Sequence, residues 1–260
     1  MSWASRRRSV YLTGVILFLV VTIGVPLAIS LYETATCFDG LQNQGETAPD
    51  RGGPCQLLDE RALIPHVIQW ARGFPVRPEG EGKGTWSAVA YIENPNAGAG
   101  VVAAPYRFRL YDERNIIITE REGVSYIMPE GVTPVYEGAI ETGNRVVSRT
   151  FFEFLAPLVW ERLTDTVGPI TVNGKAMGGT LEEPRVNAIA ENTDVRALKD
   201  VEFVAVIFDT QGNAIAASRT VLPRMEPGER HDLVFTWPYA LNVPVGRIDI
   251  LPRRAPVLQE

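Results

Sequence analysis

An uninterrupted apolar run near the N-terminus restricts this chain more than any other feature. The residues from Val10 to Leu31 include no charged side chain. At about 1.5 Å per residue, a helix of this length spans the roughly 30 Å hydrocarbon core of a bilayer. Pro26 lies inside the run, but proline is tolerated in transmembrane helices. We therefore expect a membrane-integral helix over residues 10–32.

The alternative to an anchor is a cleaved signal peptide, whose apolar region covers only about 7 to 15 residues. The run is longer than that, so we expect it to be retained. Arg6, Arg7 and Arg8 stand immediately before the run, whereas acidic residues follow it. Positive charge marks the cytoplasmic side of a span. This asymmetry predicts a cytoplasmic segment at residues 1–9 and an extracytoplasmic location for everything after the helix.

The chain has two cysteines, Cys37 and Cys55, which bracket a turn-rich polar segment with almost no apolar residue. A disulfide would replace the missing core, and closing a loop of this size contributes about 3 kcal/mol in the chain-entropy model. A zinc site is disfavoured because neither His66 nor His231 lies in the segment and two cysteines do not complete a tetrahedral set. We expect a disulfide-closed stalk over residues 33–61, outside the cytoplasm, where disulfides persist.

Four oxygen-bearing side chains cluster between the cysteines, at Asp39, Asn43, Glu46 and Asp50. Hard oxygen ligands of this kind suit Ca²⁺, which takes six to eight of them. The segment lacks the spacing of an EF-hand loop, and the same side chains commonly bond their own backbone in turns. We favour the turn interpretation and keep calcium as the alternative. Apart from calcium, no cofactor is expected.

The segment also resembles a motif of extracellular proteins, C-x-D-G-x-x-N-x-x-E-T-x-x-D-C-G-G-x-C. The matching residues are Cys37, Asp39, Gly40, Asn43, Glu46, Thr47, Asp50, Gly52, Gly53 and Cys55. The chain departs from the motif at Arg51, where the motif has a cysteine. The departure leaves two cysteines that can pair, instead of three.

Short runs of alternating apolar and polar residues follow the cysteine segment, as in half-buried antiparallel strands. The clearest runs are Trp86 to Asn94, Tyr106 to Asp112, Val146 to Leu155, Arg185 to Asn192, Val201 to Asp209 and His231 to Pro238. Between Leu57 and Arg72 we expect a short helical or irregular stretch, followed by a strand near Ile68 to Phe74. The glycine-rich Gly98 to Gly100 and Gly178 to Gly179 are interpreted as loops.

These runs repeat about 97 residues apart, which indicates duplicated domains. Asn94 and Asn192 end one pair of strands, and Asp112 and Asp209 end another, where Asx side chains turn the chain. The spacing predicts a mainly β fold with two tandem antiparallel immunoglobulin-like β-sandwiches. We place the sandwiches at residues 62–163 and 168–252, with a joint near 163–168 and a C-terminal tail at 253–260.

The stretch Tyr106 to Asp112, with Phe108, Leu110, Tyr111 and Asp112, resembles the F-x-L-Y-D signature of the FxLYD group of bacterial envelope domains. The stretch around Phe208 to Gly212 is similar to a degenerate second copy. Together with the apolar run and the cysteine motif, the chain resembles uncharacterised single-pass bacterial envelope proteins. That resemblance implies a location and a fold, without an established activity.

No sequence pattern indicates an enzyme. A net charge of −6 gives no general attraction to nucleic acid, so we expect no such partner. The two histidines lie in different predicted domains, and no nucleophile elbow or phosphate-binding glycine loop is present. A hydrolase with paired carboxylates is a weak third hypothesis.

The first functional hypothesis is a membrane-anchored, non-enzymatic protein-interaction or envelope-assembly module, whose partners are envelope proteins of unknown identity. Its contact surface would be loops or an exposed sheet edge, used by strand addition. The alternative is a ligand-binding receptor or adhesin with a calcium-stiffened stalk, which would present a concave pocket.

Overall fold

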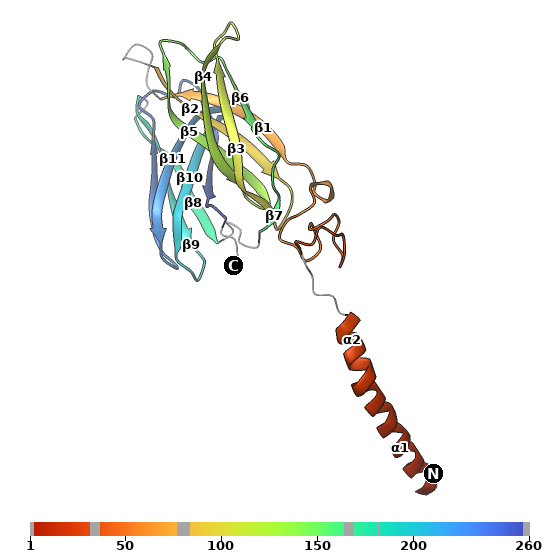
Figure 1. The fold of residues 1–260 in the computed structure, drawn as a ribbon. Helices are drawn as coiled ribbons and strands as arrows, with labels where there is room; N and C mark the ends of the chain where they lie inside the picture. The colour runs from red at the N-terminus through yellow and green to blue at the C-terminus, as the bar shows by residue number, and fades with distance from the viewer. Residues whose placement is uncertain (1–2, 32–36, 77–83, 164–168, 181, 257–260) are drawn as a thin grey trace. The chain divides into compact units, whose positions relative to one another are not determined.

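The computed structural model describes residues 3–31, 37–76, 84–163, 169–180 and 182–256. The chain divides into two compact units, Met1–Gln56 and Leu57–Glu260. The first unit holds an apolar helix and the cysteine segment, and the second holds the strands (Figure 1). The mainly β fold class expected from the sequence is confirmed.

The N-terminal helix is continuous from Trp3 to Leu31, as α1 (Trp3–Leu19), a π-helical turn η1 (Val20–Gly24) and α2 (Val25–Leu31). The π turn arises next to Pro26, which has no N–H to offer the preceding turn. The N–H of Val25 instead reaches back to the carbonyl of Val20. The stretch Arg7–Ile29 is long and apolar enough to cross a membrane.

A short 3-10 helix, η2 (Glu60–Ala62), precedes the first strands, as expected for this stretch. The first half of the strand unit then forms two antiparallel sheets. One sheet has the order β1-β2-β5, with β1 (Val67–Pro75), β2 (Gly84–Asn94) and β5 (Gly131–Gly143). The other has the order β4-β3-β6, with β4 (Ile117–Ile127), β3 (Ala99–Tyr111) and β6 (Arg149–Phe154), and β7 (Glu161–Arg162) pairs with β3.

The second half repeats this topology. One sheet has the order β8-β9-β12, with β8 (Ile170–Gly179), β9 (Pro184–Asn192) and β12 (Arg230–Thr236). The other has the order β11-β10-β13, with β11 (Ala214–Met225), β10 (Leu198–Asp209) and β13 (Val245–Arg253). In each half the first, second and fifth strands form one sheet, and the fourth, third and sixth form the other. Most of the predicted joint near 163–168 lies outside the described residues.

Three hydrophobic clusters join the four sheets into one stack. One cluster lies between the two sheets of the first half, and another lies between the two sheets of the second half. The third cluster joins the β1-β2-β5 sheet to the β11-β10-β13 sheet, through residues such as Phe74, Tyr91, Val206 and Phe208. The two halves therefore share a continuous apolar interior.

The central strands β2 and β10 are buried on both faces, which differs from the half-buried strands expected from the alternation. Along β2, Ala90 packs into the core of the first half, whereas Val89 and Tyr91 pack into the contact between the halves. Along β10, Ala205 and Val206 divide in the same way. The expectation was wrong for these two strands because a second sheet covers the face that would otherwise meet water.

A buried arginine adds polar contacts between the halves. Arg253 in β13 is only 5% exposed, and its guanidinium donates hydrogen bonds to Ser125 (2.8 Å), to Tyr126 (3.0 Å) and to the carbonyl of Pro134. Its charge is balanced by Glu202, at 3.2 Å. A buried guanidinium with several partners is strongly directional, so these contacts fix how the two halves lie against each other.

Candidate functional site

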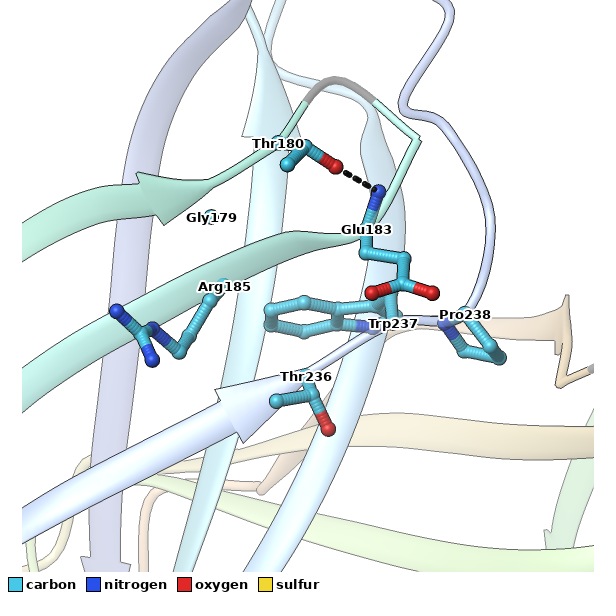
Figure 2. Close-up of a pocket in the computed structure, with 7 residues that line it drawn as sticks. All are labelled: Gly179, Thr180, Glu183, Arg185, Thr236, Trp237 and Pro238. Atoms are coloured by element: carbon cyan, nitrogen blue, oxygen red, sulfur yellow. Dashed lines mark hydrogen bonds between the residues drawn. The ribbon is translucent and has the colours of Figure 1, made fainter.

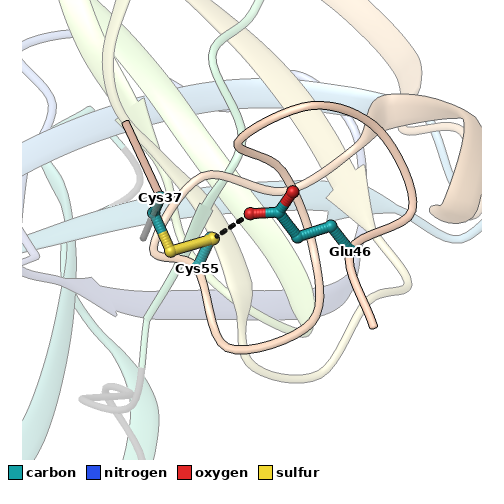
Figure 3. A group of neighbouring side chains, drawn as sticks. All are labelled: Cys37, Glu46 and Cys55. Carbon is teal, nitrogen blue, oxygen red and sulfur yellow. Dashed lines mark hydrogen bonds between the residues drawn. A yellow bond between two sulfur atoms is a disulfide. The ribbon is translucent and has the colours of Figure 1, made fainter. Parts of the chain in front are cut away.

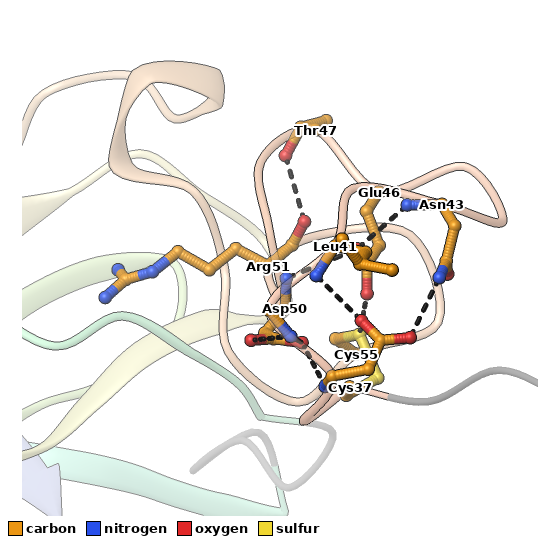
Figure 4. The surroundings of a disulfide bond; sticks show 10 residues. Cys37, Leu41, Asn43, Glu46, Thr47, Asp50, Arg51 and Cys55 are labelled. Carbon is orange, nitrogen blue, oxygen red and sulfur yellow. Dashed lines mark hydrogen bonds between the residues drawn. A yellow bond between two sulfur atoms is a disulfide. The ribbon is translucent and has the colours of Figure 1, made fainter.

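The disulfide between Cys37 and Cys55 is present, which confirms the predicted pairing (Figure 4). The two Cα atoms are 5.5 Å apart, within the usual range for a disulfide. Cys55 is 1% exposed, so the bridge forms the centre of this small segment. With few apolar residues available, the crosslink acts as the core of the loop.

The acidic side chains of the loop point at backbone amides. The Asp50 carboxylate accepts hydrogen bonds from the N–H groups of Asp39 (3.0 Å) and Gly40 (3.1 Å). The Asp39 carboxylate accepts from the N–H of Leu41 (2.8 Å) and from the side-chain amide of Asn43 (2.9 Å) (Figure 4). These contacts favour the turn interpretation of the cluster. Calcium binding stays a prediction.

Glu46 is the buried member of the cluster, at 7% exposed. Its Oε2 accepts hydrogen bonds from the N–H groups of Asn43 and Asp50, both at 3.2 Å. Its Oε1 lies 3.0 Å from the Cys55 sulfur (Figure 3). A disulfide sulfur carries no proton and is not a thiolate ligand, so Cys37, Glu46 and Cys55 do not make a thiolate metal centre as they stand.

The remaining predicted site residues bear on topology and packing. Arg6, Arg7 and Arg8 lie in the first turns of α1, where the side chains of Arg7 and Arg8 are exposed. His66 packs against the rings of Phe154 and Trp160, and its burial lowers the pKa of the imidazole. His66 is therefore a packed ring, and the role of the three arginines as a topology signal stays a prediction.

An open edge in the second half forms the most distinctive surface. Among the described residues, β8 pairs with β9 alone, so its other edge is free. The first part of that edge is obstructed by a bulge at Gly174, where the register shifts and φ is +65°, and Lys175 reaches to 3.5 Å from the carbonyl of Ile248 in β13. Bulges and lysines of this kind protect edges from pairing. The obstruction ends before Ala176.

Beyond the bulge, the edge borders an apolar depression of about 380 Å³. Its lining residues come from the end of β8, from the turn into β9 and from the segment that leads into β13: Met177, Gly178, Gly179, Thr180, Pro184, Leu241, Val243 and Val245. Met177 is paired with the fully buried Val186, so its side chain faces the interior of the sandwich. It is nevertheless 41% exposed. The interior of the sandwich is therefore open at this end.

A second depression, of about 490 Å³, lies at the same hairpin (Figure 2). Arg185, Thr236 and Trp237 are among its lining residues. The Trp237 indole N–H donates to the carbonyl of Ala217 (3.2 Å), so this ring is anchored in the core. The exposed Arg185 guanidinium has no ion-pair partner among the described residues. This depression thus has one positive and one negative side chain among its lining residues, Arg185 and Glu183 (Figure 2).

The sequence interpretation missed this region. Gly178 and Gly179, expected in a loop, end strand β8 instead, and Ala99 and Gly100 begin β3. Both corrections have the same cause, because glycine is favoured in a strand where another segment of the backbone approaches closely. A Cβ on Gly100, for example, would meet the carbonyl oxygen of Ile127 at 2.5 Å. The exposed interior position of Met177 depends on the packing of distant segments, which leaves no signal in local sequence.

No protein-family profile matches the chain, and no curated protein matches it. Solved structures that resemble it include red sea bream transglutaminase, at 8% identity and a TM-score of 0.22. A Bacteroides uniformis β-glucuronidase matches at 12% identity and a TM-score of 0.21. These two matches cover 72% and 64% of this chain, but only 29% and 23% of the two enzymes. A tandem CBM22 domain of a Paenibacillus barcinonensis protein matches at 6% identity and a TM-score of 0.16, over 75% of this chain and 86% of that one.

Proposed function

We propose that this chain is a membrane-anchored, extracytoplasmic and non-enzymatic interaction module that binds an extended segment of an envelope protein. The observation that carries the proposal is the unobstructed end of the β8 edge beside an apolar depression. An added strand obtains affinity from main-chain hydrogen bonds and specificity from pockets for alternate side chains. A free main-chain edge and an apolar depression beside it both occur between Ala176 and Gly179.

The location rests on two further features. The apolar stretch Arg7–Ile29 is long enough to anchor the chain, and Arg7 and Arg8 at its start support a cytoplasmic N-terminus. The disulfide between Cys37 and Cys55 suits an oxidising compartment beyond the membrane. In this arrangement the two sandwiches, which we regard as immunoglobulin-like and related to the FxLYD group, stand outside the cytoplasm.

The test is site-specific photocrosslinking of the full-length chain in intact cells. A photoreactive phenylalanine replaces Met177 at the rim of the depression, and the matched control replaces Val234, which is 48% exposed on β12 of the same sheet but does not line the depression. We expect one discrete adduct from position 177, identified by mass spectrometry, and none from position 234. Equal labelling from both positions, or none from 177, contradicts the proposal.

A substitution distinguishes strand addition at the edge from non-specific association. Met177→Lys places a charge on the free edge, which disfavours an added strand. We expect it to abolish capture by a photoprobe at Val243 on the same rim, whereas Val234→Lys leaves capture unchanged. A circular dichroism melt of both variants confirms that the fold is retained.

A second candidate is the ligand-binding receptor or adhesin, and the exposed Arg185 in the second depression, where Glu183 is the other charged lining residue, favours it. A guanidinium without an ion-pair partner suits a carboxylate or another anion. Arg185→Ala would then reduce binding of an acidic ligand while leaving capture through position 177 intact. Comparison of the two variants by crosslinking assigns the binding to one depression or the other.

A further inference from the structure

The cysteine loop presents two apolar side chains to solvent. Phe38 is 93% exposed, the highest value for a large apolar side chain among the described residues, and Leu41 nearby is 64% exposed. The rest of the loop surface is polar, with its acidic groups engaged in hydrogen bonds. An aromatic ring held almost entirely in water has no role in the folding of the loop, because it buries no area there.

The turn that carries these side chains is held rigidly. Asp50 accepts hydrogen bonds from the N–H groups of Asp39 and Gly40, and Asp39 accepts one from the N–H of Leu41. The turn starts directly at Cys37, which the disulfide fixes to Cys55. The ring of Phe38 and the side chain of Leu41 are therefore displayed by a braced turn, and presenting them to a partner costs little conformational entropy.

The chain length decides what this turn can meet. The apolar stretch ends at Ile29 and Phe38 follows nine positions later, so a fully extended chain separates their Cα atoms by at most about 32 Å. If the helix spans a bilayer, the loop stays within that distance of the lipid surface at all times. The lipid surface is then present at a high effective concentration, without any separate encounter.

We propose that Phe38 and Leu41 insert into the interfacial region of the bilayer and hold the cysteine loop on the lipid surface. The inference rests on the proposed anchor. The loop carries three carboxylates and one arginine, and this negative balance disfavours anionic headgroups, so the matching surface is zwitterionic lipid. Insertion needs no change in the loop, because the apolar side chains already project from it.

The experiment measures depth with full-length protein in phosphatidylcholine nanodiscs. A trifluoromethyl-phenylalanine probe replaces Phe38, and separate samples carry it at Phe18 in the apolar helix or at Phe151 on β6, which is 46% exposed. Fluorine signals are recorded with a doxyl-labelled lipid and with an aqueous gadolinium chelate. We expect lipid-induced broadening at position 38 about threefold or more above that at position 151, together with protection from gadolinium.

A second substitution tests cooperation within the turn. Leu41→Ser in the chain probed at position 38 should reduce the lipid broadening about twofold, since half of the inserting pair is lost. Thr47→Ser is the matched control on the same loop and should leave it unchanged. Intact mass without reduction confirms the disulfide in each sample.

Three outcomes overturn the inference. If position 38 is broadened by gadolinium and not by lipid, the turn stays in water. If it is shielded from both agents, the turn contacts protein instead of lipid. If the probe at position 18 also shows no lipid contact, the helix does not reside in the bilayer and the anchor proposal fails together with the insertion. The position 18 sample thus distinguishes the two failures.

Discussion

At the scale of single residues, two buried asparagines perform the same task in the two halves. Asn94 donates hydrogen bonds to the carbonyls of Ala99 (2.7 Å) and Met128 (2.9 Å), and Asn192 donates to those of Arg196 (2.9 Å) and Met225 (3.0 Å). Both side chains are fully buried. Their acceptor oxygens also form the Asx turns that were predicted from the sequence. The repeat is therefore preserved as a hydrogen-bond pattern.

Replacing one of these asparagines tests how much its side-chain amide contributes to the free energy of unfolding. Asn192→Ala leaves the buried carbonyl of Met225 and the part-buried carbonyls of Arg196 and Glu226 without their donor, so we expect a loss of about 2 to 4 kcal/mol in the free energy of unfolding. Urea denaturation at pH 7 measures it. Asn187→Ala, on the outer side of the same strand β9 and only half-buried, is the control and should change stability by less than about 0.5 kcal/mol. Equal effects would assign the loss to strand propensity.

The aspartates at the ends of β3 and β10 are also equivalent. Oδ1 of Asp209 accepts from the N–H groups of Gln211 and Asn213, both at 2.8 Å, and Oδ1 of Asp112 accepts from two amides at matching positions. The first turn lacks the glycine of the second, and Asn115 takes the left-handed conformation that Gly212 takes there, with φ of +58° and +84°. Asparagine tolerates that conformation better than other side chains.

These bonds predict a pH dependence. The hydrogen bonds from the side chain and backbone of Asn213 lower the pKa of Asp209 below its ordinary value of 3.8. The carboxylate therefore contributes stability above that value, and the contribution is lost as the pH falls through the lowered pKa. We expect Asp209→Asn to lower the urea midpoint at pH 7 and to reduce the fall in midpoint between pH 5 and about pH 3. An unchanged pH profile would exclude this carboxylate as a contributor.

At the scale of elements, local sequence predicted strands whose apolar residues alternate or run together. The predicted stretches at β2, β3, β6, β9, β10 and β12 are all strands, although β6 begins at Arg149 and not at Val146. The strand near Ile68 to Phe74 is confirmed as β1. These strands supply core side chains, so burial requires apolar residues at regular positions along them.

Several strands outside the predicted runs carry an interruption or a charged face. Strand β5 includes Pro134 and a bulge where Ala139 has a φ of +53°, and β8 includes the bulge at Gly174. Strand β4 has charged residues on its outer face, where Glu122 pairs with Arg107 of β3 at 2.6 Å. Such strands owe their structure to their neighbours, and those neighbours are distant in the sequence. The disulfide, by contrast, was predictable because only one pairing exists.

Removing the disulfide tests the cysteine loop as an element. The double substitution Cys37→Ser and Cys55→Ser removes about 3 kcal/mol of constraint, so the loop should open about a hundredfold more often. We expect trypsin to cut after Arg51 at a correspondingly higher rate. The strand unit from Leu57 is a separate compact unit, and its melting temperature should stay the same. A large fall in that temperature would show that the loop supports the strands.

At the scale of the whole molecule, the residues on the outer faces of β3 and β10 determine which of the two sheets packs against the other half. The outer face of β3 carries Arg107 and Arg109, and Arg109 pairs with Glu120 (2.8 Å) and Glu153 (3.0 Å). The equivalent positions on β10, about 97 residues later, are Val204 and Val206, which are buried against the first half. The same face of the sheet therefore meets water in the first half, whereas in the second half it packs against the first.

The shared apolar layer predicts cooperative unfolding of the two halves. Calorimetry of the wild-type chain should show a single transition for the strand unit. Val206→Asp places an unpaired charge in the contact, which should lower the transition temperature strongly or divide the transition in two. Val234→Asp, on an exposed outer face, is the control and should have little effect. A wild-type transition in the Val206→Asp chain would contradict the coupling.

The contact between the halves joins unlike sheets, the first-second-fifth sheet of one copy and the fourth-third-sixth sheet of the next. Such a contact is heterologous, because it joins two different faces, so a unit that carried both faces in apolar form would still expose one of them after pairing. In this chain the fourth-third-sixth sheet of the first half carries Arg107 and Arg109, which pair with Glu120, Glu122 and Glu153. The face that is apolar in the second half is therefore charged in the first half, which disfavours a further copy docking there.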